Sequence, residues 1–588
     1  MWRMKMKNPD TKTHQKTNHL EGKTIALCVT GGIAAIETPK LARELRRHGA
    51  NVKAYMTEEA QKFIGAAALE WATENEVATK LTGKAEHICL EDLVLVAPAT
   101  ANTISKITNG ISDNIVTTLI ASAIGQKKPV YLAPAFHKSL GDNPLLVENI
   151  SKLMKHDVKI IGPRDEEGKY KLARIDYIVA ETARELSKDP LKGKKILITA
   201  GPTIGKIDAV RYVSNHSSGK LGMEIAKDLY FRGAEVKMIY GPGKTAIPNY
   251  ISRTDVKTAA EMMEETMKEI KENGYGIVIF AAAVLDFEPE GYVDEKTSSK
   301  NGMTVKLKPT PKIIKEADTL GKRLFKVGFK LEYAKSPEDL KSIGFESLLK
   351  NNCDLVVAND LTSIKQGIHK AYVITPEKGF TQVDNKEDIA KVLAEEIGRR
   401  ETATFYHTEM TGRSEKAEEH FQRFSTTGKE LYDQGLLPKY GHSSFGNISV
   451  RAGEGFVITS RKSDKSYITT EDIVEVIKVD HAKKRKIVKG CKKPSSDTLT
   501  HEMIYKNFPE VNAIIHAHDE LIVEKPGRTP TTMKDYPCGC LEAAEEALKT
   551  LKESKSYYIA LKNHGVLALG KDLDEAKNLI LSQGLREK

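Results

Sequence analysis

The stretch VRYVSNHSSGKLG, from Val210 to Gly222, decides the fold of the central part of this chain. It follows an apolar, strand-like run at Lys195–Thr199, and it leads into an expected helix that begins near Gly222. A polar loop between a strand and a helix N-terminus presents backbone N–H groups and the positive end of the helix dipole to an anion. An ordinary strand–helix connection has only about 2–6 residues. The stretch therefore predicts a phosphate-binding loop in a doubly wound α/β domain.

With the preceding turn Ala200-Gly201-Pro202-Thr203, this stretch resembles the cytidylate-forming half of the bifunctional phosphopantothenoylcysteine decarboxylase/phosphopantothenate–cysteine ligase family. Within Val210–Gly222 only Leu221 departs, where the family has methionine. The resemblance implies ligation of cysteine to 4′-phosphopantothenate with CTP and Mg²⁺, through an acyl-cytidylate. It also implies FMN-dependent decarboxylation of the product to 4′-phosphopantetheine, a step of coenzyme A biosynthesis.

Composition limits the partners. The net charge of +10 arises from 90 basic and 80 acidic residues that are interspersed, without the basic and aromatic clusters of single-strand binders. We therefore expect no nucleic-acid partner, and we interpret the basic run Lys483–Lys486 as a solvated hairpin. No apolar run approaches the roughly 18 residues of a membrane span, and the polar start is unlike a signal peptide. Six scattered cysteines indicate a reducing compartment. These features predict a cytoplasmic protein that acts on small molecules, and we also expect a homo-oligomer.

The N-terminal part carries a second set of motifs. Gly31-Gly32 follows an apolar strand and opens a helix, which suits a phosphate. Further motifs lie at Met56-Thr57, Ala97–Asn102 and Asn109–Asn114. Together with His87 they resemble the FMN-dependent cysteine decarboxylases over residues 22–185. The resemblance implies that FMN lies beside Gly31, Gly32, Thr57, Thr100 and Asn102.

His87 occupies the position of that family's essential base. Oxidation of the cysteinyl thiol to a thioaldehyde leaves the carboxylate beta to an electron-poor C=S, and a neutral imidazole can take a proton near neutral pH. His137 stands where the family has an asparagine that holds the substrate carboxylate, and an imidazole can still donate a hydrogen bond. The family's cysteine-bearing flap is replaced by Glu167–Ala173, where Tyr170 and its two flanking lysines are the candidate proton donors.

The ligase part contains a carboxylate and a lysine at the family's spacing. Asp286 ends an apolar strand, and Lys296 follows ten residues later. A carboxylate can accept from the exocyclic amine of cytosine, and a lysine near the α-phosphate stabilises developing charge. The resemblance implies that Asn215 holds the acyl-cytidylate and that Arg211 contacts the substrate. It implies CTP contacts at Ala282, Asp286, Lys296, Pro311, Ile313, Phe329 and Lys350, although Lys312 replaces an aspartate and Lys350 has a shifted spacing.

Three histidines in the C-terminal part have the pattern of a metal site. His516 and His518 follow an apolar run, and His564 follows another. Alternate residues of a strand share a face, so His516 and His518 can bind one ion. A third imidazole gives an N₃ site with an open position, which suits Zn²⁺ as a Lewis acid. Taken alone, a His-x-His pair is as often structural as metal-binding.

The surrounding motifs, Ser443–Arg451, Pro494–Asp497 and Lys562–Val566, resemble the class II aldolase/adducin family over residues 412–586. The resemblance implies zinc at His516, His518 and His564. It implies phosphate near Asn447, Ser495 and Ser496, and it puts Asp497 in the place of a catalytic glutamate.

These patterns predict an α/β fold class with two Rossmann-like doubly wound domains followed by an α/β class II aldolase-like domain. The expected divisions are a disordered tail (1–21), a flavoprotein domain (22–188), a ligase domain (189–400), a linker (401–413) and an aldolase/adducin-like domain (414–588). Two alternatives stay open. The first two domains have drifted and the chain acts mainly as a zinc aldolase, or the third domain is a non-catalytic oligomerisation module.

Overall fold

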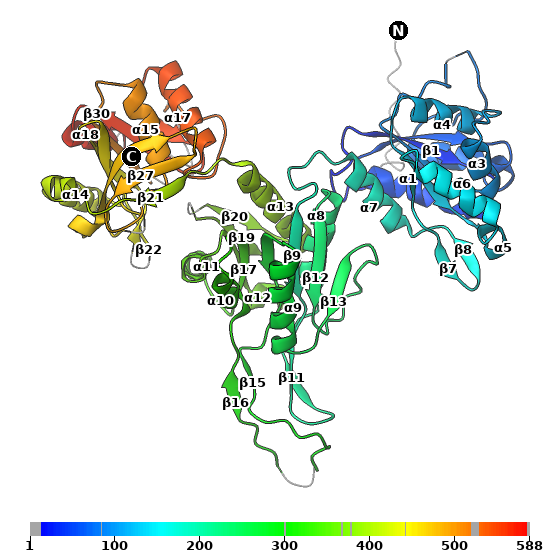
Figure 1. The fold of residues 1–588 in the computed structure, drawn as a ribbon, viewed down its shortest axis with the longest axis horizontal. Helices are drawn as coiled ribbons and strands as arrows, with labels where there is room; N and C mark the ends of the chain where they lie inside the picture. The colour runs from blue at the N-terminus through cyan, green and yellow to red at the C-terminus, as the bar shows by residue number, and fades with distance from the viewer. Residues whose placement is uncertain are drawn as a thin grey trace. The chain divides into compact units, whose positions relative to one another are not determined.

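The computed structural model describes residues 13–83, 85–298, 302–365, 369–376, 379–440, 443–461, 463–518 and 529–584. Three principal sheets, each flanked by helices, follow one another along the chain (Figure 1). No helix in the described ranges is both long and apolar enough to cross a membrane.

The first sheet has the order β2-β1-β3-β4-β6, and its described pairings are all parallel. Its side chains are buried on both faces: Leu27 packs in one cluster and Cys28 in another. This is the usual state of a parallel sheet covered by helices. The strands are β1 (Thr24–Val29), β2 (Asn51–Met56), β3 (Leu93–Ala99), β4 (Val130–Pro134) and β6 (Lys159–Ile160). The helices are α1 (Thr38–Arg47), α2 (Ala66–Thr73), α3 (Ala101–Thr108), α4 (Ile115–Gly125), α6 (Pro144–Met154) and α7 (Ile175–Leu186).

The predicted N-terminal tail is too long. The N–H of Lys16 donates to the carbonyl of Arg47 over 2.7 Å, and that of Leu20 donates to His48 over 2.8 Å. Leu20 is fully buried in the first core. Residues 13–21 are therefore described, and those from Lys16 onward are attached to the domain, whereas residues 1–12 lie outside the described ranges.

The second sheet has the order β13-β12-β9-β14-β17-β18-β19-β20. β14, β17 and β18 are parallel, and an antiparallel edge of β19 and β20 follows. The strands are β9 (Lys195–Ala200), β12 (Glu235–Tyr240), β13 (Ser252–Asp255), β14 (Ile277–Phe280), β17 (Phe325–Glu332), β18 (Leu355–Asp360), β19 (Ala371–Ile374) and β20 (Phe380–Val383). The helices are α8 (Lys220–Phe231), α9 (Ala259–Glu272), α11 (Pro337–Lys350) and α13 (Lys386–Thr402).

Two short hairpins accompany this sheet. β10 (Ile204–Lys206) pairs with β11 (Tyr212–Ser214), and β15 (Phe287–Pro289) pairs with β16 (Leu307–Pro309). The stretch that the sequence presents as one polar loop therefore contains the return strand of a hairpin before helix α8 begins (Figure 1).

The third sheet has the order β21-β27-β26-β25-β24-β28-β30-β29 and is antiparallel except for the β21–β27 pair. Separate apolar clusters cover its two faces. The strands are β21 (His407–Met410), β24 (Asn447–Ala452), β25 (Gly455–Thr459), β26 (Ile473–Asp480), β27 (Arg485–Lys489), β28 (Ala513–Ala517), β29 (Tyr558–Leu561) and β30 (Gly565–Gly570). The helices are α14 (Lys416–Asp433), α15 (Thr498–Asn507), α17 (Leu541–Ser554) and α18 (Leu573–Gly584).

Two expectations for this region need correction. The expected linker 401–413 contains β21, an edge strand of the third sheet, because residues 407–410 pair with β27. The basic run does form a hairpin between β26 and β27, but it is not fully solvated: Lys486 is only 7% exposed.

Candidate functional site

In the first domain, four predicted flavin residues meet at the carboxyl ends of neighbouring strands. Gly31 and Gly32 follow β1, Thr57 follows β2 and Thr100 follows β3. A Cβ at Gly31 would lie 2.4 Å from Cβ of Glu59, so this position requires glycine. The hydroxyl of Thr57 accepts from the N–H of Ala60 over 3.2 Å. This part of the sheet, which we call the glycine edge (Gly31, Gly32, Thr57 and Thr100), fits a phosphate-bearing cofactor, because ligands of parallel α/β sheets bind at the carboxyl ends of strands.

Three further residues of this domain lie on loops or helix ends. Asn102 is exposed in the first turn of α3, whose N-cap is Thr100. His87 is exposed in a turn before β3. His137 belongs to β5 (Phe136–His137), where its Nδ1 accepts from the N–H of Ser139 over 3.2 Å. Among the described residues, no hydrogen bond joins His87 or His137 to Gly31, Gly32, Thr57 or Thr100.

The replaced flap is a hairpin of β7 (Arg164–Glu166) and β8 (Lys169–Lys171), and β8 also pairs with β5. Tyr170 donates to Oδ1 of Asp142 over 3.0 Å, and this hydrogen bond raises the pKa of the Tyr170 hydroxyl. The hairpin therefore brings Tyr170 and His137 to one small sheet.

In the second domain, the predicted anion loop ends at α8. Gly219 has a φ of +78°, and a Cβ there would lie 2.6 Å from the ring of Tyr240, so glycine is required. The hydroxyl of Ser217 accepts from the N–H of Gly219, and that of Ser218 accepts from the N–H of Lys220, both over 3.3 Å. Two amides of the loop are thus already hydrogen-bonded to its own serines.

Asn215 connects this loop to the segment that carries Asp286. Its Nδ2 donates to the carbonyls of Ala283 and Val284, each over 3.2 Å. Asp286 is exposed three residues from Ala283 and forms an ion pair with Lys312. The structure therefore brings Asn215 and the predicted base-reading segment together, and it gives Asp286 a cationic neighbour.

The other predicted nucleotide residues divide into two groups. Ala282 follows β14. Thr310 donates through its hydroxyl to the carbonyl of Leu285 and through its N–H to the carbonyl of Asp286. Pro311 comes next in the chain, and Ile313 starts α10 (Ile313–Glu316). Phe329 lies within β17, opposite Val357 of β18. Lys296 is exposed, and Arg211 donates to Oδ2 of Asp208 over 2.6 Å.

Lys350 is placed differently. It is the last residue of α11 and precedes the amino end of β18, whereas the other residues lie toward the carboxyl ends of the parallel strands. A six-residue strand spans about 20 Å. Lys350 therefore lies at the opposite end of these strands from the other predicted nucleotide residues, and its contact with CTP stays a prediction.

In the third domain, the three predicted metal ligands come together. His516 lies in β28, His518 follows it, and His564 lies in the turn between β29 and β30. One ligand atom from each histidine lies within 4.8 Å of the others. The pairing of β28 with β30 explains this, since Ala517 is opposite Val566.

A carboxylate orients the first of these histidines. Oδ2 of Asp497 accepts from Nδ1 of His516 over 2.7 Å and from Nδ2 of Asn447 over 2.6 Å. Burial alone would raise the pKa of Asp497, but His516 holds it well below its ordinary value. Nε2 of His516 is buried without a hydrogen-bond partner among the described residues, and a Cβ at Gly565 would lie only 2.7 Å from it. This orphaned nitrogen and the N₃ donor set fit a zinc ion.

Ser495 and Ser496 flank the same carboxylate, and a cysteine joins them. Ser495 is buried, and its carbonyl accepts a hydrogen bond from the hydroxyl of Thr498, the first residue of α15. The thiol of Cys538 lies 3.0 Å from Oγ of Ser496 and 2.8 Å from Oδ1 of Asp497. The sequence pattern does not predict this contact, because Cys538 has no spacing relation to the histidines.

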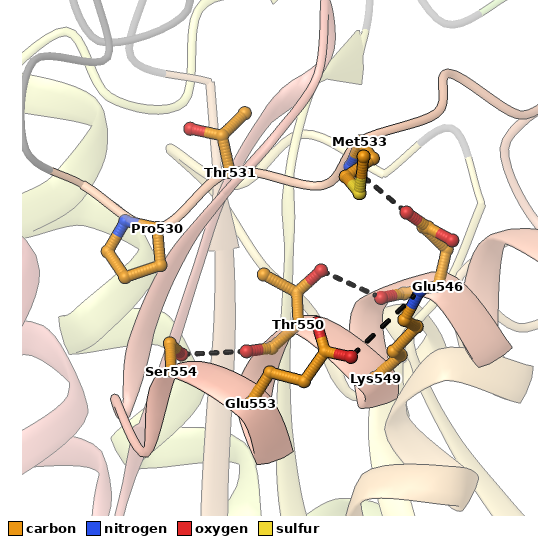
Figure 2. Close-up of a pocket in the computed structure, with 8 residues that line it drawn as sticks. All are labelled: Pro530, Thr531, Met533, Glu546, Lys549, Thr550, Glu553 and Ser554. Atoms are coloured by element: carbon orange, nitrogen blue, oxygen red, sulfur yellow. Dashed lines mark hydrogen bonds and ion pairs between the residues drawn. The ribbon is translucent and has the colours of Figure 1, made fainter.

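A separate pocket of about 300 Å³ lies beside α17 (Figure 2). Pro530, Thr531 and Met533 line one side, and Glu546, Lys549, Thr550, Glu553 and Ser554 line the other. The N–H of Met533 donates to the Glu546 carboxylate over 3.0 Å. None of the predicted site residues lines this pocket.

Family models match all three parts. Residues 13–187 match the Flavoprotein model, and residues 191–400 match the DNA/pantothenate metabolism flavoprotein C-terminal domain. Residues 422–523 match the Class II Aldolase and Adducin N-terminal domain. A crystal structure of the DNA/pantothenate metabolism flavoprotein from Streptococcus pneumoniae is 29% identical, with a TM-score of 0.32, over 35% of this chain and 98% of that one.

Two relatives match the first two parts together. The coenzyme A biosynthesis bifunctional protein CoaBC of Thermococcus kodakarensis is 43% identical over 393 residues, which are 65% of this chain and 96% of the relative. That of Methanocaldococcus jannaschii is 38% identical over 389 residues, 65% of this chain and 95% of the relative. The resemblance inferred from the motifs is thereby confirmed. The chain belongs to the family of bifunctional CoaBC enzymes of coenzyme A biosynthesis, and it carries a class II aldolase-type domain in addition.

Proposed function

We propose that the second domain joins cysteine to 4′-phosphopantothenate with CTP and Mg²⁺. The substrate carboxylate attacks the α-phosphate of CTP and releases pyrophosphate, and the amine of cysteine then displaces CMP from the acyl-cytidylate. Asp286 accepts from the cytosine amine, Lys296 stabilises charge on the α-phosphate, and Asn215 holds the intermediate. Arg211 contacts the substrate.

The observation that best supports this proposal is the position of Asn215. Its amide reaches the carbonyls of Ala283 and Val284, so the Asn-x-Ser-Ser-Gly-Lys loop and the segment before Asp286 form one surface. The identity to both relatives, over nearly their full lengths, favours working first and second domains over the alternative in which these domains have drifted.

Release of CMP and pyrophosphate tests the ligase proposal. With 4′-phosphopantothenate and CTP we expect pyrophosphate release, and CMP should appear at a sustained rate only when cysteine is added. Lys296→Gln should abolish both, because it keeps length and removes the charge. Lys308→Gln, an exposed lysine of the neighbouring β16, is the matched control and should keep both activities. CMP release by Lys296→Gln at the wild-type rate would refute the role of Lys296.

We propose that the first domain decarboxylates the ligation product. FMN held at the glycine edge would supply a two-electron oxidation of the cysteinyl thiol and, after loss of CO₂, the matching two-electron reduction that gives the thiol product. His87 takes a proton, and His137 binds the substrate carboxylate. The gathering of Gly31, Thr57 and Thr100 after the carboxyl ends of three neighbouring strands supports the cofactor assignment, because ligands of parallel α/β sheets bind there.

We propose that the third domain binds zinc at His516, His518 and His564 and cleaves a phosphorylated hydroxy-carbonyl compound. Zinc bound there supplies Lewis-acid polarisation of the substrate carbonyl. Asn447, Ser495 and Ser496 bind the phosphate, and Asp497 moves the proton. The alternative of a non-catalytic oligomerisation module would be supported if zinc stays bound while no sugar phosphate is cleaved.

We also propose that the full chain forms a homo-oligomer. Each chain has three domains, and the third domain begins at β21. Large apolar side chains of the first domain are exposed, including Ile33 at 71%, Leu90 at 77% and Leu145 at 68%. Light scattering coupled to size exclusion would test this, since a monomeric mass at micromolar concentration would contradict it.

A further inference from the structure

The turn at Asp208 contains a carboxylate that does more than close the turn. Asp208 is 3% exposed. Its Oδ1 accepts from the backbone N–H groups of Val210 (2.8 Å) and Arg211 (2.7 Å), which is the usual local hydrogen bonding of an aspartate in a turn. Its Oδ2 accepts from Nη1 of Arg211 (2.6 Å) and from the backbone N–H of Thr297 (3.3 Å). The backbone donors at Val210 and Arg211 lower the pKa of Asp208 to about 2.

The bond to Thr297 spans 89 positions of the sequence and reaches the residue after Lys296. The carbonyl of Thr297 in turn accepts from Nη1 of Arg211 over 3.1 Å. Further back in the same loop, the N–H of Val293 donates to the carbonyl of Ile207 over 3.3 Å. Thr297 is therefore held through its N–H and its C=O, and the loop is attached at a second point.

The side chain of Lys296 lies between these attachment points and is exposed. Its ammonium group forms no hydrogen bond or ion pair with the other described residues. The attachments thus fix the backbone on both sides of Lys296 while its ammonium group stays available. The turn also leads through β11 into Asn215, so one carboxylate connects the two segments that the proposed reaction needs.

We propose that Asp208 is a positioning residue for the ligation: it fixes the peptide bond between Lys296 and Thr297 and so directs Lys296 to the reacting phosphate of CTP. This inference rests on the proposed function of the second domain. A misplacement of about 1 Å can cost roughly 100-fold in rate. An aspartate with only the local turn role would need Oδ1 alone.

Two readouts on Asp208→Asn in the full chain test the inference. Trypsin cleaves after lysine, so the amide that Asp208 holds belongs to the bond that trypsin would cut. The folded protein is digested with trypsin, and mass spectrometry follows the cleavage of the Lys296–Thr297 bond over time. We expect this bond to be cleaved at least about tenfold faster in Asp208→Asn than in wild type. We expect the kcat of ligation to fall about 10- to 100-fold, while the KM for CTP changes less than about threefold. Asp294→Asn is the matched control, because Asp294 is an exposed acid two residues from Lys296 that accepts a hydrogen bond from the hydroxyl of Tyr292.

A pair of Thr297 variants leaves Asp208 intact, in case Asp208→Asn does not fold. Thr297→Ala keeps the backbone N–H and should behave as wild type, whereas Thr297→Pro removes it and should lower kcat as Asp208→Asn does. Wild-type trypsin cleavage of Asp208→Asn, or faster cleavage with unchanged kcat, would overturn the inference. If the wild-type chain itself shows no ligation, the proposed function fails, and the trypsin comparison still decides whether the attachment exists.

Discussion

Nδ1 of His516 donates to Oδ2 of Asp497 over 2.7 Å, which leaves the other ring nitrogen of His516 with a free lone pair. That nitrogen, Nε2, is buried and has no hydrogen-bond partner among the described residues. A carboxylate bound to the far side of an imidazole fixes the ring orientation and raises its strength as a metal ligand. Asp497 is therefore placed to support the proposed zinc site, in addition to the catalytic role predicted from the sequence.

Replacement of Asp497 by asparagine should weaken zinc binding. Asparagine can accept the hydrogen bond without the charge, and loss of such a partner costs about 10- to 100-fold in metal affinity. Competition with a chromophoric chelator would measure the zinc Kd. Asp480→Asn, the same change at an acid of β26 that contacts Arg485 and the N–H of Lys483, should leave the Kd unchanged. Equal zinc affinity of Asp497→Asn and wild type would show that the His516 contact does not support the metal.

Replacement of Lys312 by methionine should improve CTP binding. The ammonium of Lys312 pairs with the carboxylate of Asp286, so the cytosine amine must compete for that carboxylate. Both side chains are largely exposed, and such a pair contributes about 0.2–1 kcal/mol. We therefore expect the KM for CTP to fall about 1.5- to 5-fold with kcat unchanged. A higher KM would mean that Lys312 itself contacts the nucleotide.

The third domain should become more stable as the pH rises from about 8 to 10. Lys465 is 3% exposed and donates to the carbonyls of Ser444 (2.8 Å) and Ser463 (3.1 Å). Burial lowers its pKa to about 8, against about 10.4 when unfolded. Between these values the unfolded state binds the extra proton, so the free energy of unfolding rises by up to about 1.4 kcal/mol per pH unit.

Below pH 8 both states hold the proton, and this contribution no longer changes with pH. Urea unfolding at pH 7, 8, 9 and 10 would measure the slope, and Lys465→Met should lose this part of it. Identical slopes for the variant and wild type would contradict the lowered pKa.

Features that depend on local periodicity could be predicted from the sequence. His516 and His518 share a face because strand residues alternate, and the apolar run before them belongs to β28, which includes His516. The run at Lys195–Thr199 lies within β9, and α8 begins at Lys220, two residues before the expected position. In each case the deciding interactions are between near neighbours in the chain.

Features that depend on tertiary contacts could not be predicted. The position of Lys350 follows from the direction of α11, which residue spacing does not reveal. β11 is only three residues long, so its pairing with β10 has no periodic signal. Cys538 reaches Asp497, and Asp208 reaches Thr297, across 41 and 89 positions. Such contacts are set by how the elements pack.

One chain is expected to perform both ligation and decarboxylation, and mass spectrometry of its products is the decisive test. Supplied with 4′-phosphopantothenate, cysteine and CTP, the wild-type protein should yield 4′-phosphopantetheine and CMP. His87→Asn should stay yellow with bound flavin and accumulate 4′-phosphopantothenoylcysteine, because the base is lost while the glycine edge is intact. A wild-type protein that holds FMN and forms neither product would contradict the bifunctional activity. A His87→Asn variant that still forms 4′-phosphopantetheine would contradict the role of His87 as the base.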